Sequence, residues 1–289
     1  MMKKHTVLYS IIILLLFFCF PEVIISSSTS YYFRTLGIND GLSQSTVNAI
    51  LQDQKGFMWI GTKDGLNQYD GQECRVFQKE NSSLGNNFIT ALYEDCEGYI
   101  WVGTDAGVYI YNPVQEAFQF LDTEIASSGE KITRAVTWIT SDSQNNIWIS
   151  VDNQGLFCYN RGKKNLTKVV SCGKSGIANV THFWFYAGQL WIARYEDNLY
   201  VSKDNSSFNA FNDVDGEDIF KGLVINSYVE GLHNCLYVGT SKGLMEINLT
   251  SRKVRKLLDE YVRDICFRSD TDLWIGTEQG LYIYNIETD

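Results

Sequence analysis

Six side chains of this sequence are of types that could recognise or transform a ligand, and they interrupt an otherwise regular pattern. They are Trp138, His182, Arg194, Tyr195, Arg263 and Asp264. Aromatic rings stack on the apolar faces of sugars, and planar charged groups form paired hydrogen bonds with hydroxyls. We therefore predict that these residues form a ligand-binding site suited to carbohydrate. The alternative for each residue, taken singly, is irregular packing within a degenerate repeat.

Catalytic chemistry has less support. A glycoside hydrolase needs two carboxylates about 5–9.5 Å apart, and only Asp264 with Glu196 or Asp197 could supply them. The sequence has three histidines, of which His5 lies near the N-terminus, and it has no zinc-protease, phosphate-loop or dinucleotide-binding motif. Residues 141–148 resemble a sialidase Asp box only faintly, and the other units do not repeat it. We predict a non-enzyme that binds no metal and no cofactor.

The six candidate residues belong to a repeat whose anchor is an aromatic residue that opens a Trp-Ile-Gly-Thr-like tetrapeptide. The anchors are Trp59, Trp101, Trp148, Trp191, Tyr237 and Trp274. Successive anchors lie 42, 47, 43, 46 and 37 residues apart. A period of about 40–45 residues with strand-type sequence is typical of a β-propeller. We predict an all-β propeller with six visible four-stranded repeats, the last of them incomplete.

The first unit shows the strands of one blade. It predicts strands at 47–51, 57–60, 66–69 and 73–77, with a turn at 53–56. Each blade lies between two others, so its central strands should be apolar on both faces. The recurring residues are therefore predicted to be structural, with the tryptophans wedged between blades. They are Trp59, Gly61, Trp101, Gly103, Trp148, Trp191, Gly239, Trp274 and Gly276.

The innermost strand of each blade should line the central channel. Its second residue is polar in every unit, and its third residue is small in three units but large or ionisable in the other three. Trp138, His182 and Asp264 are those larger third residues, and Arg263 is a second residue. Arg194 and Tyr195 follow the second strand of the fourth unit. We expect these residues to converge at one mouth of the channel.

Composition and termini set further limits. The chain has 289 residues and a formal net charge of −10, which does not suit binding to nucleic acid or to anionic membranes. Residues 1–28 have the layout of a secretory signal peptide, with a retained membrane anchor as the alternative. The propeller domain is predicted to span residues 31–289. Residues 31–36 form a predicted outer strand that could close a six-bladed ring; alternatively, the ring continues and the chain is cut short.

Seven cysteines are present, and none forms a Cys-x-x-Cys pair. We predict that those outside the leader are small buried residues, since Cys158 and Cys266 fall within strand patterns. A disulfide between Cys158 and Cys172 is the alternative.

The first unit also carries a family resemblance. The stretch 41–47, Asp53 and the stretch 56–71 together resemble the regulatory propeller repeat of the hybrid two-component sensors of gut Bacteroidetes. The resemblance extends over most of residues 31–289 and is weaker in the third to fifth units.

This resemblance implies more than the chain contains. Members of the family carry two seven-bladed propellers and an immunoglobulin-like module, followed by a membrane helix, a histidine kinase, a receiver and a DNA-binding domain. Their sensor regions are periplasmic and detect oligosaccharides released from glycans. By this resemblance the chain is an N-terminal fragment or a truncated reading frame, covering the first propeller. The family has no motif that marks ligand residues, so no site is transferred from it.

The leading hypothesis is an extracytoplasmic sensor propeller, exported by its signal peptide, that binds glycan-derived oligosaccharides. Its expected partners are the oligosaccharide, the remaining sensor domains or a second copy of the chain, and not nucleic acid. A secreted propeller that only mediates protein contacts is the first alternative. A propeller-fold polysaccharide lyase or glycoside hydrolase is the second.

Overall fold

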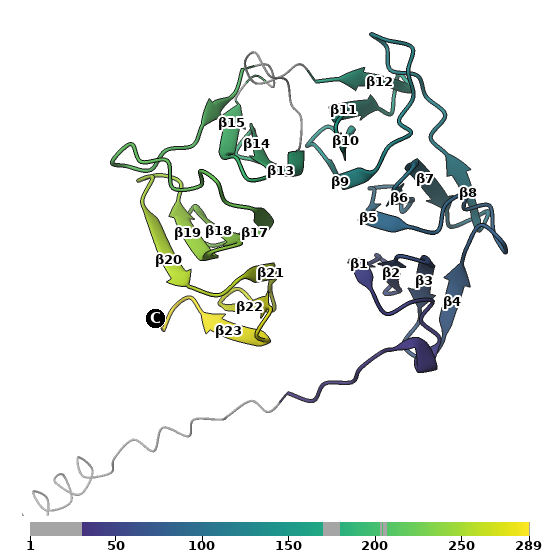
Figure 1. Cartoon of the computed structure of the whole chain (residues 1–289), viewed down its shortest axis with the longest axis horizontal. Coiled ribbons are helices and arrows are strands. Elements are labelled where there is room, and N and C mark those ends of the chain that lie inside the picture. The colour runs from purple at the N-terminus through teal and green to yellow at the C-terminus, as the bar shows by residue number, and fades with distance from the viewer. Residues whose placement is uncertain (1–30, 170–179, 203, 205–206, 289) are drawn as a thin grey trace, which may run out of the picture. The chain divides into compact units, whose positions relative to one another are not determined.

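The fold was taken from a computed structural model that describes residues 31–169, 180–202, 204 and 207–288. Six antiparallel sheets follow one another in chain order around a central axis (Figure 1). Residues 36–289 form one compact unit, and residues 31–35 belong to a separate one. The predicted all-β propeller with six blades is confirmed.

The strands have the following bounds. Blades 1 to 3 comprise β1 (Val47–Gln52), β2 (Met58–Thr62), β3 (Gly65–Tyr69), β4 (Cys74–Phe77); β5 (Ile89–Glu94), β6 (Ile100–Thr104), β7 (Gly107–Asn112), β8 (Ala117–Phe120); β9 (Val136–Ser141), β10 (Ile147–Val151), β11 (Gly155–Asn160), β12 (Asn165–Lys168). Blades 4 to 6 comprise β13 (Val180–Tyr186), β14 (Gln189–Arg194), β15 (Leu199–Ser202), β16 (Asn209–Ala210); β17 (Ile225–Glu230), β18 (Cys235–Thr240), β19 (Gly243–Asn248), β20 (Val254–Leu258); β21 (Val262–Phe267), β22 (Asp272–Thr277), β23 (Leu281–Asn285). A short 3-10 helix, η1 (Ile38–Asp40), precedes β1.

The strands predicted for the first unit agree with β1 to β4 to within one or two residues at each end. The predicted outer strand at 31–36 is wrong, because these residues form no strand, and the sheet of blade 6 has three strands. Residues 1–28, which include the predicted signal peptide, lie outside the described residues. Among the described residues, no helix has the length and apolar character needed to cross a membrane.

The anchor aromatics pack between blades, as predicted. The ring of Trp59 in blade 1 lies 5.0 Å from that of Tyr111 in blade 2, and Trp101 lies 5.6 Å from Tyr159 in blade 3. Such tilted aromatic contacts add to the area that the rings bury. Trp59 and Trp101 therefore stabilise the interfaces between their blades and the next ones.

In blades 1, 2 and 5, the glycine two residues after the anchor permits close approach of the next blade. A Cβ added at Gly103 would stand 2.8 Å from Cγ1 of Val136, the first residue of the next inner strand. Gly61 and Gly239 have the same relation to the blades that follow them. Gly276 differs, since its nearest neighbour would be the Asp264 carbonyl at 3.6 Å.

A β-bulge at the start of each inner strand re-aims the side chain of its second residue. The Asn48 side chain donates to the carbonyl of Ile89 at 2.8 Å, and Asn226 donates to the carbonyl of Val262 at 2.7 Å. Thr137 makes the same contact with Val180 at 3.0 Å. In blades 1, 3 and 5 the polar second residue thus joins its blade to the next one, a role that the channel-lining interpretation missed. Thr181 and Arg263 instead contact Ala193 and Glu278 of their own blades.

Apolar side chains of blade 1 and blade 6 are exposed to solvent. Val47 and Ile50 of β1 are 39% and 62% exposed, whereas the corresponding Ile89 and Ile139 are buried. Leu281 of β23 is 44% exposed. The inner strands pack against one another in the order β1, β5, β9, β13, β17 and β21.

The described cysteines are all free thiols, and only some fit the buried prediction. Cys74, Cys158 and Cys235 are half-buried, but Cys96 and Cys266 are exposed. Burial raises the pKa of Cys158 to about 11. Cys172, its suggested disulfide partner, lies outside the described residues.

Candidate functional site

In blades 1 to 3, the turn between the first and second strands carries an aspartate that holds the turn and the anchor indole. The Asp53 carboxylate accepts hydrogen bonds from the backbone N–H groups of Lys55 and Phe57, at 3.0 and 2.9 Å, and from Nε1 of Trp59 at 2.8 Å. The same contact joins Asp95 to Trp101 at 2.7 Å and Asp142 to Trp148 at 2.9 Å. These three aspartates hold the turns and the anchor indoles.

This finding corrects the interpretation of residues 141–148 as an unrepeated pattern. Blades 1 and 2 carry the same arrangement at Asp53 and Asp95, six residues before the anchor in each case. Burial alone would raise the pKa of Asp142, but hydrogen bonds from Trp148 and Asn146 outweigh it and lower that pKa. The carboxylate is therefore ionised and structural at neutral pH.

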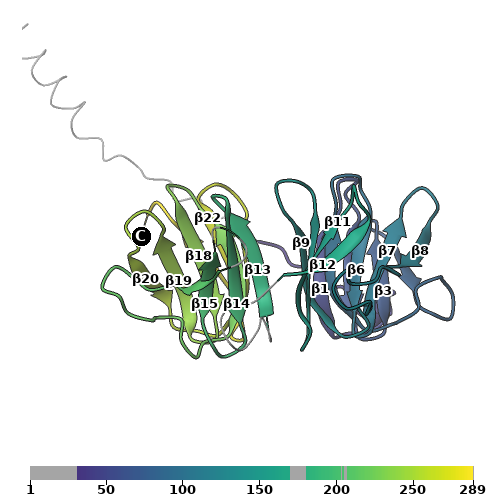
Figure 2. The same ribbon diagram turned by 90° about the horizontal axis from the view of Figure 1, so that it is seen from above.

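We call the side of the ring that carries these turns the Asp-turn face. Because paired strands are antiparallel, the turns between third and fourth strands emerge on the same face. Figure 2 shows the ring from the side, with turns leaving the strands on both faces. Two sizeable cavities lie between blades on the Asp-turn face, as their lining residues show.

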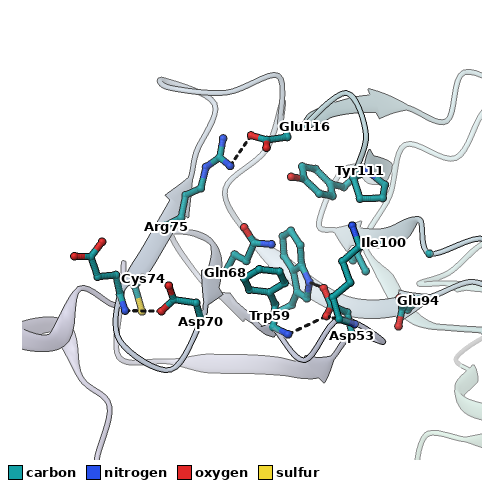
Figure 3. A pocket seen from close by; sticks show the side chains of 15 residues that line it. Asp53, Trp59, Gln68, Asp70, Cys74, Arg75, Glu94, Ile100, Tyr111 and Glu116 are labelled. Carbon is teal, nitrogen blue, oxygen red and sulfur yellow. Dashed lines mark hydrogen bonds and ion pairs between the residues drawn. The ribbon is translucent and has the colours of Figure 1, made fainter.

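The first cavity, of about 540 Å³, lies between blades 1 and 2 (Figure 3). Its wall has five carboxylates and two cations together with aromatic rings. The lining residues with functional side chains are Asp53, Lys55, Trp59, Gln68, Asp70, Glu73, Arg75, Glu94, Tyr111 and Glu116. Its volume is in the range of small-molecule sites.

Internal contacts engage much of this lining. Arg75 forms an ion pair of 2.7 Å with Glu116 across the two blades, and its guanidinium lies 4.8 Å from the Phe77 ring. Asp70 accepts hydrogen bonds from the backbone of Glu73 and Gln72, which lowers its pKa. These groups stabilise the turns and the blade interface, so the cavity is built largely as structure.

Glu94 differs from Asp70 in the direction of its pKa shift. Burial raises its pKa, and one hydrogen bond from the backbone N–H of Gln54 opposes that shift. A carboxyl with a raised pKa can act as a proton donor. A second carboxylate placed to work with Glu94 as acid and base is not evident from the contacts in this cavity.

The second cavity, of about 670 Å³, lies between blades 4 and 5 on the same face. Among the described residues, its lining is richer in amide and hydroxyl groups and has one carboxylate and one cation. The lining includes Tyr186, Gln189, Trp191, Asp204, Ser207, Asn209, Phe211, Asn234, Thr250 and Arg252. Balanced charge and many neutral hydrogen-bonding groups suit an uncharged polar ligand.

The predicted channel-mouth residues lie at the other end of the blades, and two of them meet. The rings of Trp138 and His182 are 4.5 Å apart, joining blades 3 and 4. Burial lowers the pKa of His182 to about 4, against the opposing effect of a hydrogen bond with the Ile225 backbone. His182 is therefore neutral at pH 7. Trp138 Nε1 and His182 Nδ1 are buried and have no hydrogen-bond partner among the described residues.

Arg194 and Tyr195 lie in the turn after β14. Arg194 forms an ion pair with Asp197 at 2.8 Å, and its guanidinium lies 5.7 Å from the Tyr200 ring. The Tyr200 hydroxyl also donates to Asp197, at 3.2 Å. Tyr195 is 54% exposed. This turn presents an aromatic ring to solvent beside a locally paired arginine.

Arg263 and Asp264 lie in blade 6. Arg263 forms an ion pair with Glu278 at 2.6 Å and packs over the Tyr261 ring. Burial raises the pKa of Asp264, while a hydrogen bond from the Ile265 backbone opposes the shift. The structure thus brings Trp138 and His182 together and gives Arg194, Arg263 and Asp264 separate local contacts.

The carboxylates suggested for hydrolysis lie in different blades. Glu196 and Asp197 belong to blade 4 and Asp264 to blade 6, with blade 5 between them. A Gly-x-Ser-x-Gly stretch ends at Gly243, but it forms a β-hairpin turn in which the Ser241 hydroxyl accepts from the Val224 backbone. In α/β-hydrolases, the Gly-x-Ser-x-Gly motif that presents the nucleophile lies instead at a strand-to-helix turn. Within the described ranges, no three His, Cys, Asp or Glu side chains are grouped to hold a metal ion.

Sequence reasoning missed both cavities on the Asp-turn face. One available signal was the aspartate six residues before Trp59, Trp101 and Trp148, which is replaced by Phe185 before Trp191. The aspartate is also absent before Tyr237 and Trp274, where Gly231 and Arg268 stand, so only blades 1 to 3 keep this turn motif.

Comparison with known proteins agrees with this repeat structure. The two component regulator propeller family matches residues 41–64, 83–106 and 256–279. These three stretches are two component regulator propeller repeats. They lie in blades 1, 2 and 6, which keep the anchor tetrapeptide intact.

Two proteins of signalling systems are similar to this propeller. A segment of 53 residues is 40% identical to histidine kinase P4 of Formosa agariphila, covering 18% of this chain and 4% of that protein. The extracellular domain assigned to the hybrid two component system BT3049 of B. thetaiotaomicron matches with a TM-score of 0.73 and 26% identity. That match covers 88% of this chain and 35% of the BT3049 chain. This propeller therefore spans about a third of the solved structure that it matches.

An enzyme shares the fold. A virginiamycin B lyase from Staphylococcus aureus matches with a TM-score of 0.61 and 12% identity, over 86% of this chain and 87% of the lyase. At that identity the likeness shows the fold alone.

Proposed function

We propose that this chain is a ligand-sensing propeller of a hybrid two-component system, that it works outside the cytoplasm, and that its ligands are oligosaccharides released from glycans. The observation that carries the proposal is the similarity over 88% of the chain to the extracellular domain of BT3049. The two inter-blade cavities, lined by aromatic, amide and carboxylate groups, support a role in binding.

A sensor responds to its ligand only if two arrangements of the protein bind that ligand with different affinities. Both cavities are built from two adjacent blades, so a ligand in either would contact both at once. Binding would then favour the arrangement in which the two blades fit the ligand best. Output through a kinase would require further parts of a longer protein.

Binding is tested by isothermal titration calorimetry of the full chain against size-fractionated oligosaccharides from starch, xylan, mannan, pectin and mucin glycans. We expect saturable binding of one fraction and weaker binding of its constituent monosaccharides. Cooperative thermal unfolding serves as the control for folding. A folded protein that gives no binding heat with any fraction would refute the glycan proposal.

The same mixtures distinguish a sensor from a hydrolase. Reducing ends should not accumulate over hours of incubation with the bound oligosaccharide. New reducing ends that disappear in Asp264→Asn would favour a hydrolase instead. The export proposal predicts an N-terminus after Ser26 or Ser28 when the protein is recovered from the periplasm, whereas an intact leader would contradict cleavage.

A further inference from the structure

Blade 4 lacks the carboxylate that holds the anchor indole in blades 1 to 3. Phe185 stands six residues before Trp191, and the turn that follows β13 is short, with Ala187 and Gly188 at φ of +48° and +73°. Trp191 is 3% exposed, and its Nε1 has no hydrogen-bond partner among the residues that the structure describes. A buried donor without an acceptor is a rare and costly feature.

This unpartnered donor belongs to a residue that lines the cavity between blades 4 and 5. The equivalent Trp59 lines the cavity between blades 1 and 2, where Asp53 fills the acceptor position and is itself part of the wall. In the first cavity, Asp53 of the turn accepts the hydrogen bond from the indole. In the second cavity, a ligand oxygen could serve as that acceptor. Its volume of about 670 Å³ lies within the range of small-ligand sites.

The rim of this cavity carries neutral polar groups from both blades. The Tyr186 hydroxyl of blade 4 donates to Oδ1 of Asn234 in blade 5 at 3.2 Å. The Asn234 side chain in turn donates to the Thr250 hydroxyl at 3.3 Å. Both hydrogen bonds are long and join exposed groups. A ligand hydroxyl could therefore take the place of either partner in each bond.

Arg252 completes the rim. Its Nε donates to the Asn212 carbonyl at 3.0 Å, and its guanidinium lies 5.1 Å from the Phe211 ring. Within the described part of the chain, Arg252 forms no ion pair with a carboxylate, in contrast to Arg75, which is paired with Glu116. The guanidinium is thus held in place by stacking and remains able to donate to a ligand oxygen.

We propose that the cavity between blades 4 and 5 is a binding pocket for a neutral mono- or disaccharide. In the complex, Trp191 Nε1 donates to a sugar oxygen, and Asn234 and Arg252 bind further hydroxyls. A neutral sugar fits because the cavity has balanced charge and because its oxygens are the acceptors that the indole lacks. The proposal rests on the proposed function for its ligand class.

Because Trp191 Nε1 is buried in the free protein, sugar binding requires the groups that cover it to move. The free protein bears the cost of the unpartnered indole, and the ligand relieves it.

The test is NMR of the full chain labelled with ¹⁵N at the indoles of its seven tryptophans. Trp191→Phe assigns the Trp191 signal by its loss. The probes are maltose, cellobiose, lactose, mannobiose and xylobiose, with glycerol and acetate as other oxygen donors. We expect one or more disaccharides to shift the Trp191 signal to a saturable end point.

Variants then measure the contribution of each contact. Trp191→Phe should weaken binding of the active disaccharide by about 3- to 10-fold, which is the effect of one hydrogen bond. Arg252→Ala should weaken it by a similar factor. Arg75→Ala is the matched control, because Arg75 also stacks on a phenylalanine but lines the other cavity. Both Trp191→Phe and Trp59→Phe remove buried ring area and should lower the melting temperature, but Trp59→Phe should lower it more because it also loses the hydrogen bond to Asp53.

The outcomes separate the two proposals. A disaccharide could shift the NMR signal of another indole but not that of Trp191, and lose affinity in Arg75→Ala but not in Arg252→Ala. That result would overturn this pocket but would not contradict glycan sensing. A Trp191 shift with acetate or glycerol but with no sugar would overturn the sugar assignment. No shift with any probe in the folded chain would overturn the pocket, and the oligosaccharide titrations then decide the proposed function independently.

Discussion

Replacement of Asp95 by alanine should be the most damaging single change among the turn aspartates. Its carboxylate accepts from the backbone of Glu97 at 2.9 Å and of Tyr99 at 3.1 Å, and from Trp101 Nε1 at 2.7 Å. It also forms an ion pair of 3.2 Å with Arg161, which reaches over from blade 3. One residue thus fixes a turn, an anchor indole and a blade interface.

The magnitude follows from these contacts. Three hydrogen bonds at about 1 kcal/mol each give a loss of about 3 kcal/mol in the free energy of unfolding. The partly buried ion pair adds about 1 kcal/mol. Asp53→Ala removes the same three hydrogen bonds without an ion pair and should cost only the first amount. A loss of about 4 kcal/mol lowers the melting temperature by roughly 8–16 °C for a domain of this size.

The assay is urea and thermal unfolding of both variants, followed by tryptophan fluorescence and circular dichroism. Asp105→Ala, in an exposed turn of the same blade, is the control and should change stability by less than about 0.5 kcal/mol. A double-mutant cycle of Asp95→Ala with Trp101→Phe should show coupling. Losses below about 1 kcal/mol for both Asp95→Ala and Asp53→Ala would refute the view that these carboxylates hold the blades.

Three further predictions concern packing and pH. Gly103→Ala should cost about 1–3 kcal/mol, because its Cβ would meet Val136 at 2.8 Å, whereas Gly276→Ala should be nearly neutral in urea unfolding; equal costs would contradict the close blade contact. Because burial lowers the pKa of His182 to about 4 from an unfolded value of about 6.5, the folded state binds its proton more weakly; stability should fall as pH drops from about 6.5 toward 4. His182→Gln should flatten that part of the stability–pH curve, and an unchanged slope would exclude His182 as its source. The lowered pKa of Asp142 stabilises the fold above about pH 4, so acid unfolding in Asp142→Asn should depend less on pH in that region; an identical acid transition would contradict this.

The sequence predicted the repeat well because the information is local. Alternating turns and apolar strands set the blade boundaries, and the strands of the first unit matched to within one or two residues. The rings of Trp59, Trp101 and Trp148 each contact an aromatic ring of the following blade. Residues 31–36 were wrongly predicted to form a strand, since an alternating pattern specifies no partner sheet to pair with.

The site was harder to predict because it depends on neighbours in other blades. The repeat pattern placed Asn48 on a strand that lines the channel. In the structure its side chain donates to the Ile89 carbonyl, 41 residues away in the sequence. The cavity around Trp191 requires Tyr186, Asn234 and Arg252 to meet across two blades. No single repeat contains that arrangement.

The sequence by itself determined the architecture of this protein: the period, the strands, the turns and the residues that repeat. It did so because strand pairing and turn formation within a blade involve residues close together in the chain. Only the tertiary structure decided which polar groups are satisfied. Among the described residues, the Trp59 indole has the Asp53 carboxylate of its own blade as acceptor, whereas the Trp191 indole at the wall of the second cavity has none.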